Sequence, residues 1–173
     1  MLTPYLEIGE VLKPQGVQGL VKVRPDTDAP ERYLVLKSVF VEAEGGYREL
    51  PISDQSLRDG YVYLRLDDAR TRDEAEKQRG LMLYVDRAHA RPLGKDEWYI
   101  TDLVGCRVSL DSGEMVGEVT EVMQPGANDV FVIRGPKGEI LVPVLRDVLV
   151  SVDVEDRSIV LNARRFREVA VLP

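Results

Sequence analysis

Residues 6–24 read LEIGEVLKPQGVQGLVKVR and carry the clearest fold signal in the chain. A β-type run over residues 6–13 ends at a proline. A second run follows over residues 20–24, where Val21 and Val23 alternate with two basic residues. Alternation with a period of two predicts a strand with one buried face. Gly16 and Gly19 bracket the connection between the runs, so we predict that both glycines shape a tight turn.

Short β-type runs bounded by Gly, Pro, Asn or Asp continue outward from this stretch along the whole chain. They predict strands near residues 38–43, 47–52, 61–66, 81–85, 106–110, 115–123, 130–134, 139–142, 149–154 and 158–161. No regular alternation of strands with long helices accompanies them, which argues against a parallel sheet. The sequence therefore predicts a mainly β protein with two small β-barrel domains and short helices, joined by a linker.

Short stretches of sequence predict the helices and the domain boundary. Thr71 and Glu74 have the spacing of a capping box, and Gly80 stands where a left-handed C-terminal cap is expected. We also expect a helical turn over residues 98–104. A polar stretch with a proline and a glycine indicates a linker. We place the first domain at residues 1–88, the linker at 89–95 and the second domain at 96–173.

Charge is distributed unevenly. The chain has 173 residues, 23 Lys and Arg, 30 Asp and Glu, and a formal net charge of −7. Residues 1–91 carry 14 basic and 16 acidic side chains, whereas residues 92–173 carry 9 and 14. Binding to the phosphates of a nucleic acid needs clustered Lys and Arg. The acidic second half is therefore better suited to a basic partner. The lack of a signal segment or long apolar run predicts a cytoplasmic protein.

The sequence contains no recognisable catalytic arrangement. His89 has no nearby nucleophile to activate, so we expect it to be exposed to solvent. Cys106 precedes a predicted strand and is expected to be a buried, small hydrophobic residue. Neither a phosphate-binding glycine loop nor the Cys and His spacing of a zinc site occurs. We therefore predict no enzymatic activity, no metal and no cofactor.

Two groups of residues are candidates for binding. Lys22, Arg24, Tyr61, Tyr63 and Arg65 alternate with apolar residues and are candidate RNA-facing residues on one side of a barrel. The alternative is an ordinary solvated strand face.

The second group is the adjacent pair Trp98 and Tyr99, in the acidic segment DEWYITD. Adjacent residues point in different directions, so that one aromatic ring can anchor the core while the other meets a protein partner. The alternative is that the pair only seals the domain junction. Arg164 to Arg167 form a basic cluster that we interpret as a strand end balancing local acid rather than a contact.

The order of several short motifs resembles the RimM family of ribosome maturation factors. These are IGEV at 8–11, KPQGVQGLVKV at 13–23, DAPERY at 28–33, WYITDLVG at 98–105, GEV at 117–119, GANDV at 126–130 and LVP at 141–143. The resemblance covers nearly the whole chain and implies an N-terminal RimM barrel followed by a PRC barrel. Independently of the resemblance, the residue types of the connection at 125–128 predict a turn, with Gly126 and Asn128 as its structural residues. Two departures stand out: Gln15 precedes Gly16 where the family commonly has His, and Trp98 replaces the first of two tyrosines.

The resemblance implies a non-enzymatic, chaperone-like assembly factor acting late in maturation of the small ribosomal subunit head. Its implied partners are free small subunits and a head ribosomal protein, bound by the PRC domain with the help of the aromatic pair. The factor supports processing of small-subunit rRNA by other enzymes. A weak contact with rRNA is also expected. Two alternatives stay open: a direct RNA-binding module, and a metal-dependent nuclease or hydrolase.

Overall fold

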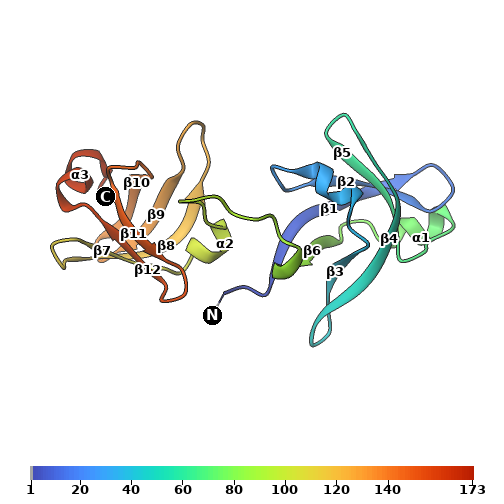
Figure 1. Ribbon diagram of the computed structural model, residues 1–173, viewed down its shortest axis with the longest axis horizontal. Coiled ribbons are helices and arrows are strands. Elements are labelled where there is room, and N and C mark those ends of the chain that lie inside the picture. Colours follow the sequence, from blue (N-terminus) through green and yellow to red (C-terminus); the bar gives the residue numbers. More distant parts are fainter. Residues whose placement is uncertain (1) are drawn as a thin grey trace. The chain divides into compact units, whose positions relative to one another are not determined.

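The computed structural model describes residues 2–173 as two compact units. Pro4–Pro92 form one unit, and Leu93–Pro173 belong to the other. Each unit has its own hydrophobic core and its own sheet (Figure 1). The division of the chain falls inside the predicted linker, where residues 91–94 form no helix, strand or turn. The prediction of a mainly β protein with two sheet domains and few short helices is confirmed.

The sheet of the first unit is a closed barrel. Its strands are β1 (Tyr5–Gln15), β2 (Leu20–Pro25), β5 (Tyr61–Leu66), β4 (Gly46–Arg58), β3 (Ser38–Ala43) and β6 (Met82–Asp86), in that order around the barrel. Neighbouring strands are antiparallel, and β6 pairs with β1 to close the ring. The predicted alternation holds in β5, where Val62, Leu64 and Leu66 are fully buried. The barrel interior is thus filled by the apolar members of alternating strands.

Three short helices complete this unit: η1 (Pro30–Leu34), α1 (Arg72–Glu76) and η2 (Arg87–His89). The predicted capping box is present, because Thr71 Oγ1 accepts from Glu74 N and the Glu74 carboxylate accepts from Thr71 N. Gly80 does have a positive φ of 81°, but it is not the helix cap that the sequence predicts, because α1 ends at Glu76 and Lys77 is its C-cap residue. Strand β1 continues past Pro14 to Gln15, beyond the predicted end. Strand β4 is also longer than predicted, because a bulge between Ser53 and Ser56 lets pairing with β5 continue.

The second unit has a six-stranded sheet. Its strands are β10 (Gly138–Pro143), β9 (Val130–Gly135), β8 (Met115–Met123), β7 (Arg107–Leu110), β12 (Ser158–Leu161) and β11 (Leu149–Asp153), in that order. All neighbours are antiparallel except β12 and β7, which are parallel. The core includes Phe131, Ile133, Ile159 and Leu161. Among the described residues, no strand pairing joins β10 to β11.

Helices α2 (Ile100–Leu103) and α3 (Ala163–Val169) flank this sheet. Helix α3 corrects the interpretation of the basic cluster, which lies in a helix and not at a strand end. The side chain of Asn162 caps the helix by accepting from Arg165 N, and Phe166 is buried in the core. Arg165 forms ion pairs with Asp147 and Glu168. The cluster therefore does balance nearby acid, but from a helical face. Within residues 2–173, no helix is long and apolar enough to cross a membrane.

Candidate partner-binding surfaces

The candidate RNA-facing residues of the first unit lie on adjacent barrel strands. Lys22 of β2 lies opposite Tyr63 of β5 in the strand register, and both side chains are half-buried on the outer side of the barrel. Val21 and Val23, the neighbours of Lys22, are fully buried on the other side. The Lys22 Nζ lies 3.9 Å from the centroid of the Tyr61 ring. This is a cation–π contact, so the structure brings the predicted lysine and tyrosines together.

Two arginines extend this surface. The guanidinium carbon of Arg58 lies 4.3 Å from the centroid of the Tyr63 ring. Sequence analysis missed Arg58 because the predicted strand stopped at residue 52. Arg24 is exposed and pairs with the Glu10 carboxylate of the neighbouring strand, so its charge is partly balanced within the protein. We call Lys22, Arg24, Arg58, Tyr61 and Tyr63 the cation–tyrosine face.

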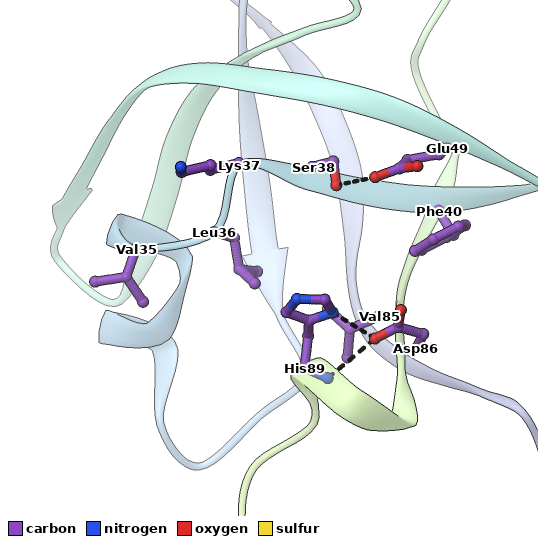
Figure 2. Close-up of a pocket in the computed structure, with 9 residues that line it drawn as sticks. All are labelled: Val35, Leu36, Lys37, Ser38, Phe40, Glu49, Val85, Asp86 and His89. Atoms are coloured by element: carbon purple, nitrogen blue, oxygen red, sulfur yellow. Dashed lines mark hydrogen bonds and ion pairs between the residues drawn. The ribbon is translucent and has the colours of Figure 1, made fainter.

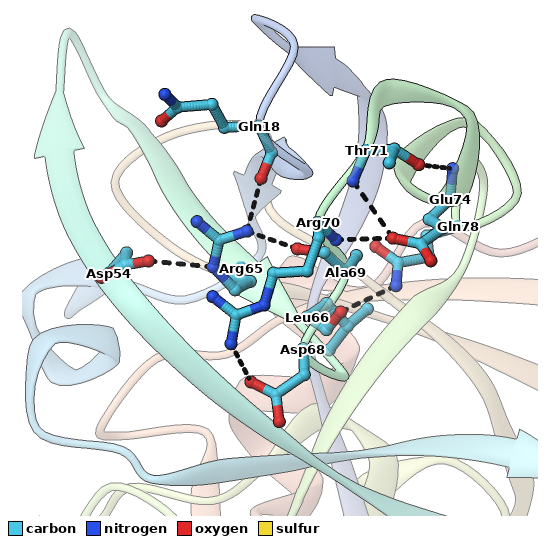
Figure 3. A network of polar contacts seen from close by, with 10 residues as sticks. All are labelled: Gln18, Asp54, Arg65, Leu66, Asp68, Ala69, Arg70, Thr71, Glu74 and Gln78. Carbon is cyan, nitrogen blue, oxygen red and sulfur yellow. Dashed lines mark hydrogen bonds and ion pairs between the residues drawn. The ribbon is translucent and has the colours of Figure 1, made fainter.

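Arg65 does not belong to this face, which corrects the prediction for that residue. It is 8% exposed, and its guanidinium donates to the carbonyl oxygens of Gln18 and Ala69 and, at 3.0 Å, to Asp54 Oδ2 (Figure 3). Alternation does place Arg65 on the polar side of β5. However, the β1–β2 turn and the segment after β5 fold over it at this end of the barrel. Arg65 therefore joins three segments of the chain.

The β1–β2 turn explains the two predicted glycines. Gly16 and Gly19 adopt φ values of 69° and 88°, the left-handed region that favours glycine. A Cβ atom on Gly19 would lie 2.2 Å from the carbonyl oxygen of Ala69, whereas one on Gly16 would meet no atom within 4 Å. The turn therefore packs directly against the backbone that Arg65 also binds, and Gly19 is the residue that permits this approach.

The aromatic pair Trp98 and Tyr99 lies at the start of α2 in the second unit. Trp98 is partly buried and packs against the hydrophobic core of that unit. Tyr99 is the N-cap residue of α2, and its carbonyl oxygen accepts hydrogen bonds from the backbone N–H of Asp102 at 2.9 Å and Leu103 at 3.3 Å. Both side chains remain partly exposed. The structure thus gives Trp98 a packing role without covering it completely.

Acidic and basic residues alternate across the sheet of the second unit. Arg107, Glu118, Arg134 and Glu139 lie in one register row across β7, β8, β9 and β10. Each carboxylate in this row therefore has an arginine on a neighbouring strand. The net acidity of the unit comes from other positions, which include the exposed Asp96 and Glu97 beside the aromatic pair.

The predicted turn residues Gly126 and Asn128 lie in the exposed loop between β8 and β9. Gln124 Nε2 donates to Asp129 Oδ1 at 3.2 Å across this loop. Gly126 does not have a positive φ, and a Cβ there would meet no atom within 4 Å. The local geometry therefore does not require glycine at residue 126, in contrast to residue 19.

Cys106 and His89, the residue types here most often used in catalysis, both make contacts that fit a structural role. Cys106 is fully buried and its Sγ donates to the carbonyl oxygen of Asp102 at 3.2 Å, and burial raises the pKa of the thiol. The side chain of His89 is 67% exposed, and its Nδ1 lies 2.6 Å from Asp86 Oδ1. Both expectations, a buried cysteine and an exposed histidine, are confirmed. Within residues 2–173, no three His, Cys, Asp or Glu side chains are grouped so as to hold a metal ion.

Comparison with known proteins gives matches to both halves. A family model described as the RimM N-terminal domain matches residues 6–90, and one described as the RimM PRC barrel domain matches residues 100–166. The chain is 43% identical over 147 residues to the ribosome maturation factor RimM of Desulfitobacterium hafniense, covering 85% of each protein. It is 36% identical to that of Caldanaerobacter subterraneus subsp. tengcongensis, covering 93% of this chain and 97% of the relative.

Among solved structures, a crystal structure of a RimM protein from Pseudomonas aeruginosa, described as a 16S ribosomal RNA processing protein, has a TM-score of 0.46 to this chain. The two sequences are 22% identical, and the match covers 91% of this chain and 96% of that chain.

Proposed function

Because the chain belongs to the RimM family of ribosome maturation factors, we propose that it is a cytoplasmic, non-enzymatic assembly factor for the head of the small ribosomal subunit. The observation that carries this proposal is the match of both family models, one to each half of the chain. The factor acts in a chaperone-like way late in maturation, by binding free small subunits and holding their head in a form that other enzymes can process.

The second unit binds a basic ribosomal protein of the head. Trp98 and Tyr99 are partly exposed at the start of α2, and Asp96 and Glu97 lie beside them. A partly exposed aromatic pair supplies the apolar contact area that anchors many protein interfaces. Nearby carboxylates raise the rate of encounter with a cationic partner and disfavour acidic competitors.

The first unit makes a weaker contact with the rRNA of the head through the cation–tyrosine face. Tyr61 and Tyr63 offer half-buried rings on which an unpaired base can stack, and Lys22 and Arg58 lie over these rings. Because Arg24 is already paired with Glu10, this face carries few free cations. We therefore assign it a supporting role in subunit binding.

Replacement of the aromatic pair tests the protein contact. Tyr99→Ala and the double variant Trp98→Ala/Tyr99→Ala should weaken binding of the full chain to purified free small subunits. Loss of an interface anchor costs about 2 kcal/mol, which corresponds to about 30-fold in affinity. Circular dichroism checks that each variant is folded, and Tyr99→Ala provides the test if the loss of Trp98 from the core unfolds the unit. A folded Tyr99→Ala variant with unchanged affinity contradicts the proposed interface.

A direct RNA-binding module is the second candidate function, favoured by the two cation–π contacts on the first unit. It predicts tight binding to naked small-subunit rRNA, with an affinity that falls steeply as salt increases. It also predicts that Lys22→Met/Arg58→Met abolishes subunit binding while the aromatic pair can be replaced without loss. Our proposal predicts that replacement of the aromatic pair weakens subunit binding more than Lys22→Met/Arg58→Met does.

A further inference from the structure

A second cluster of aromatic rings lies on the outer side of the first unit, and it shares only strand β4 with the cation–tyrosine face. Tyr5, Phe40, Tyr47 and Tyr84 come from β1, β3, β4 and β6. The rings of Tyr5 and Tyr47 are stacked with centroids 4.1 Å apart, and Phe40 and Tyr84 approach this pair at 4.9 and 5.1 Å. Tyr47 is 36% exposed, although it belongs to a contiguous cluster of rings. This surface is thus partly uncovered in the isolated chain.

Each of these four rings lies opposite a carboxylate residue on a neighbouring strand. The register pairs are Tyr5 with Asp86, Tyr84 with Glu7, Phe40 with Glu49 and Tyr47 with Glu42. The Tyr84 hydroxyl donates to Glu42 Oε1 at 2.9 Å, which adds a contact to a second carboxylate. Cross-strand neighbours of this kind lie on the same side of the sheet. We call these eight residues the acidic aromatic face.

A groove of about 320 Å³ extends this face (Figure 2). It shares Phe40, Glu49 and Asp86 with the face. Leu36 and Val85 add an apolar wall, and in Figure 2 both point toward the His89 ring. The Lys37 side chain points away from Asp86 in this view. The groove therefore combines an apolar lining with carboxylates at its polar end.

The surroundings of two groups on this face disfavour their ionised forms. Desolvation by surrounding side chains, together with the carboxylates of Asp26 and Glu10, raises the pKa of Glu7. Desolvation also raises the pKa of the Tyr84 hydroxyl, and Glu42 adds to this effect. A cation bound beside Glu7 would favour the ionised form of its carboxyl group. The negative faces of the aromatic rings attract cations as well.

We propose that the acidic aromatic face binds an extended segment of a basic protein through its arginine or lysine side chains. The four ring–carboxylate pairs are spread over strands β1, β6, β3 and β4, a width of about 14 Å at the usual strand spacing. Side chains at positions i, i+2 and i+4 of an extended peptide cover about 13 Å on one side. Three alternating cations of such a segment therefore span the width of the face. The groove holds one such side chain, with its stem along Leu36 and Val85 and its charge at Glu49 and Asp86.

Titration of the full chain with a short peptide tests this inference. The probe is an acetylated and amidated pentapeptide of alternating arginine and serine, Arg-Ser-Arg-Ser-Arg. The matched control peptide carries citrulline, a neutral analogue, in place of each arginine. In amide-resolved NMR spectra, the arginine peptide should shift resonances of β3, β4 and β6, and the citrulline peptide should not.

Two sets of variants identify the surface. Glu42→Gln/Glu49→Gln/Asp86→Asn neutralises the face while keeping side chains that can accept the same hydrogen bonds, and it should weaken peptide binding about tenfold or more. The control Asp59→Asn/Asp67→Asn/Asp73→Asn removes the same charge elsewhere on the unit and should bind like the parent protein. Equal loss in both variants, or shifts confined to residues outside the face, would overturn the inference.

This surface is independent of the aromatic pair at residues 98 and 99. The peptide should therefore shift the same resonances of the first unit in a Tyr99→Ala protein. Loss of small-subunit binding in that protein tests the proposed function, and retention of the peptide shifts tests the acidic aromatic face.

Discussion

Replacement of Arg65 by methionine should destabilise the first unit severely while leaving its outer surface intact. Methionine keeps most of the volume but removes the donors that hold the carbonyl oxygens of Gln18 and Ala69. A hydrogen bond from a charged group contributes about 1.5–3 kcal/mol. The ion pair with Asp54 adds little, because the Asp54 side chain is 58% exposed. We therefore expect the free energy of unfolding to fall by about 3 to 5 kcal/mol.

Urea denaturation of the full chain, followed by amide-resolved NMR, measures this loss for each unit separately. The single tryptophan, Trp98, belongs to the second unit, so its fluorescence serves as an internal reference that Arg65→Met should leave unchanged. Arg58→Met is the matched control on the same barrel. It removes an exposed arginine with a cation–π contact and should cost about 0.5–1 kcal/mol.

A fall of less than about 1 kcal/mol in the free energy of unfolding of Arg65→Met would contradict this role of the buried guanidinium. Equal stability of Arg65→Met and Arg58→Met would also contradict it, because the two arginines would then be equivalent surface residues. A folded Arg65→Met protein that loses rRNA contact at full stability would restore Arg65 to the RNA-facing group.

Two further predictions concern backbone geometry and pH. Gly19→Ala should destabilise the first unit by more than about 2 kcal/mol in urea denaturation, because its Cβ would contact the Ala69 carbonyl. Gly16→Ala, which adds a Cβ in open space, should cost only about 1 kcal/mol, and equal costs would contradict this account. Because the folded state raises the pKa of Glu7, ionisation of this carboxyl opposes folding, so Glu7→Gln should raise the melting temperature at pH 7. That advantage should shrink as the pH falls through the titration of Glu7, and an advantage that is constant with pH would show that the charge is not its cause.

Features that depend on neighbouring residues could be predicted from the sequence. The capping box of Thr71 and Glu74 requires only four consecutive residues, and the burial of Val62 and Leu64 follows from alternation within one strand. The left-handed conformation of Gly16 and Gly19 was likewise predictable, because a short connection between two strands needs residues that tolerate a positive φ.

Features that depend on distant contacts could not be predicted in this way. Alternation assigns Arg65 to the polar side of β5, but only the folded barrel brings Gln18 and Ala69 over it. Arg58 was missed because a bulge lengthens β4, and its partner ring at Tyr63 lies on another strand. Each ring of the acidic aromatic face faces a carboxylate on a different strand, so the sequence alone shows neither the rings nor the charges as a group.

The sequence contains a local signal for α3. Asn162 is a good N-cap residue, and Arg164 and Glu168 have the i,i+4 spacing of a helical ion pair. The strand-end interpretation rests on the charge of the basic cluster alone and neglects this helical spacing.

The pairing of β6 with β1 affects how the chain folds during its own synthesis. Tyr5 is paired with Asp86, so one edge of the first strand has no partner until the sixth strand has left the ribosome. At about 5–20 residues per second, this delay is roughly 4 to 16 seconds. Closure of the ring must then fix many contacts at once, because the contacts are distant in sequence. A nascent chain stalled before residue 82 should therefore expose an unpaired β1 edge to proteases and chaperones, and one stalled well beyond residue 92 should not.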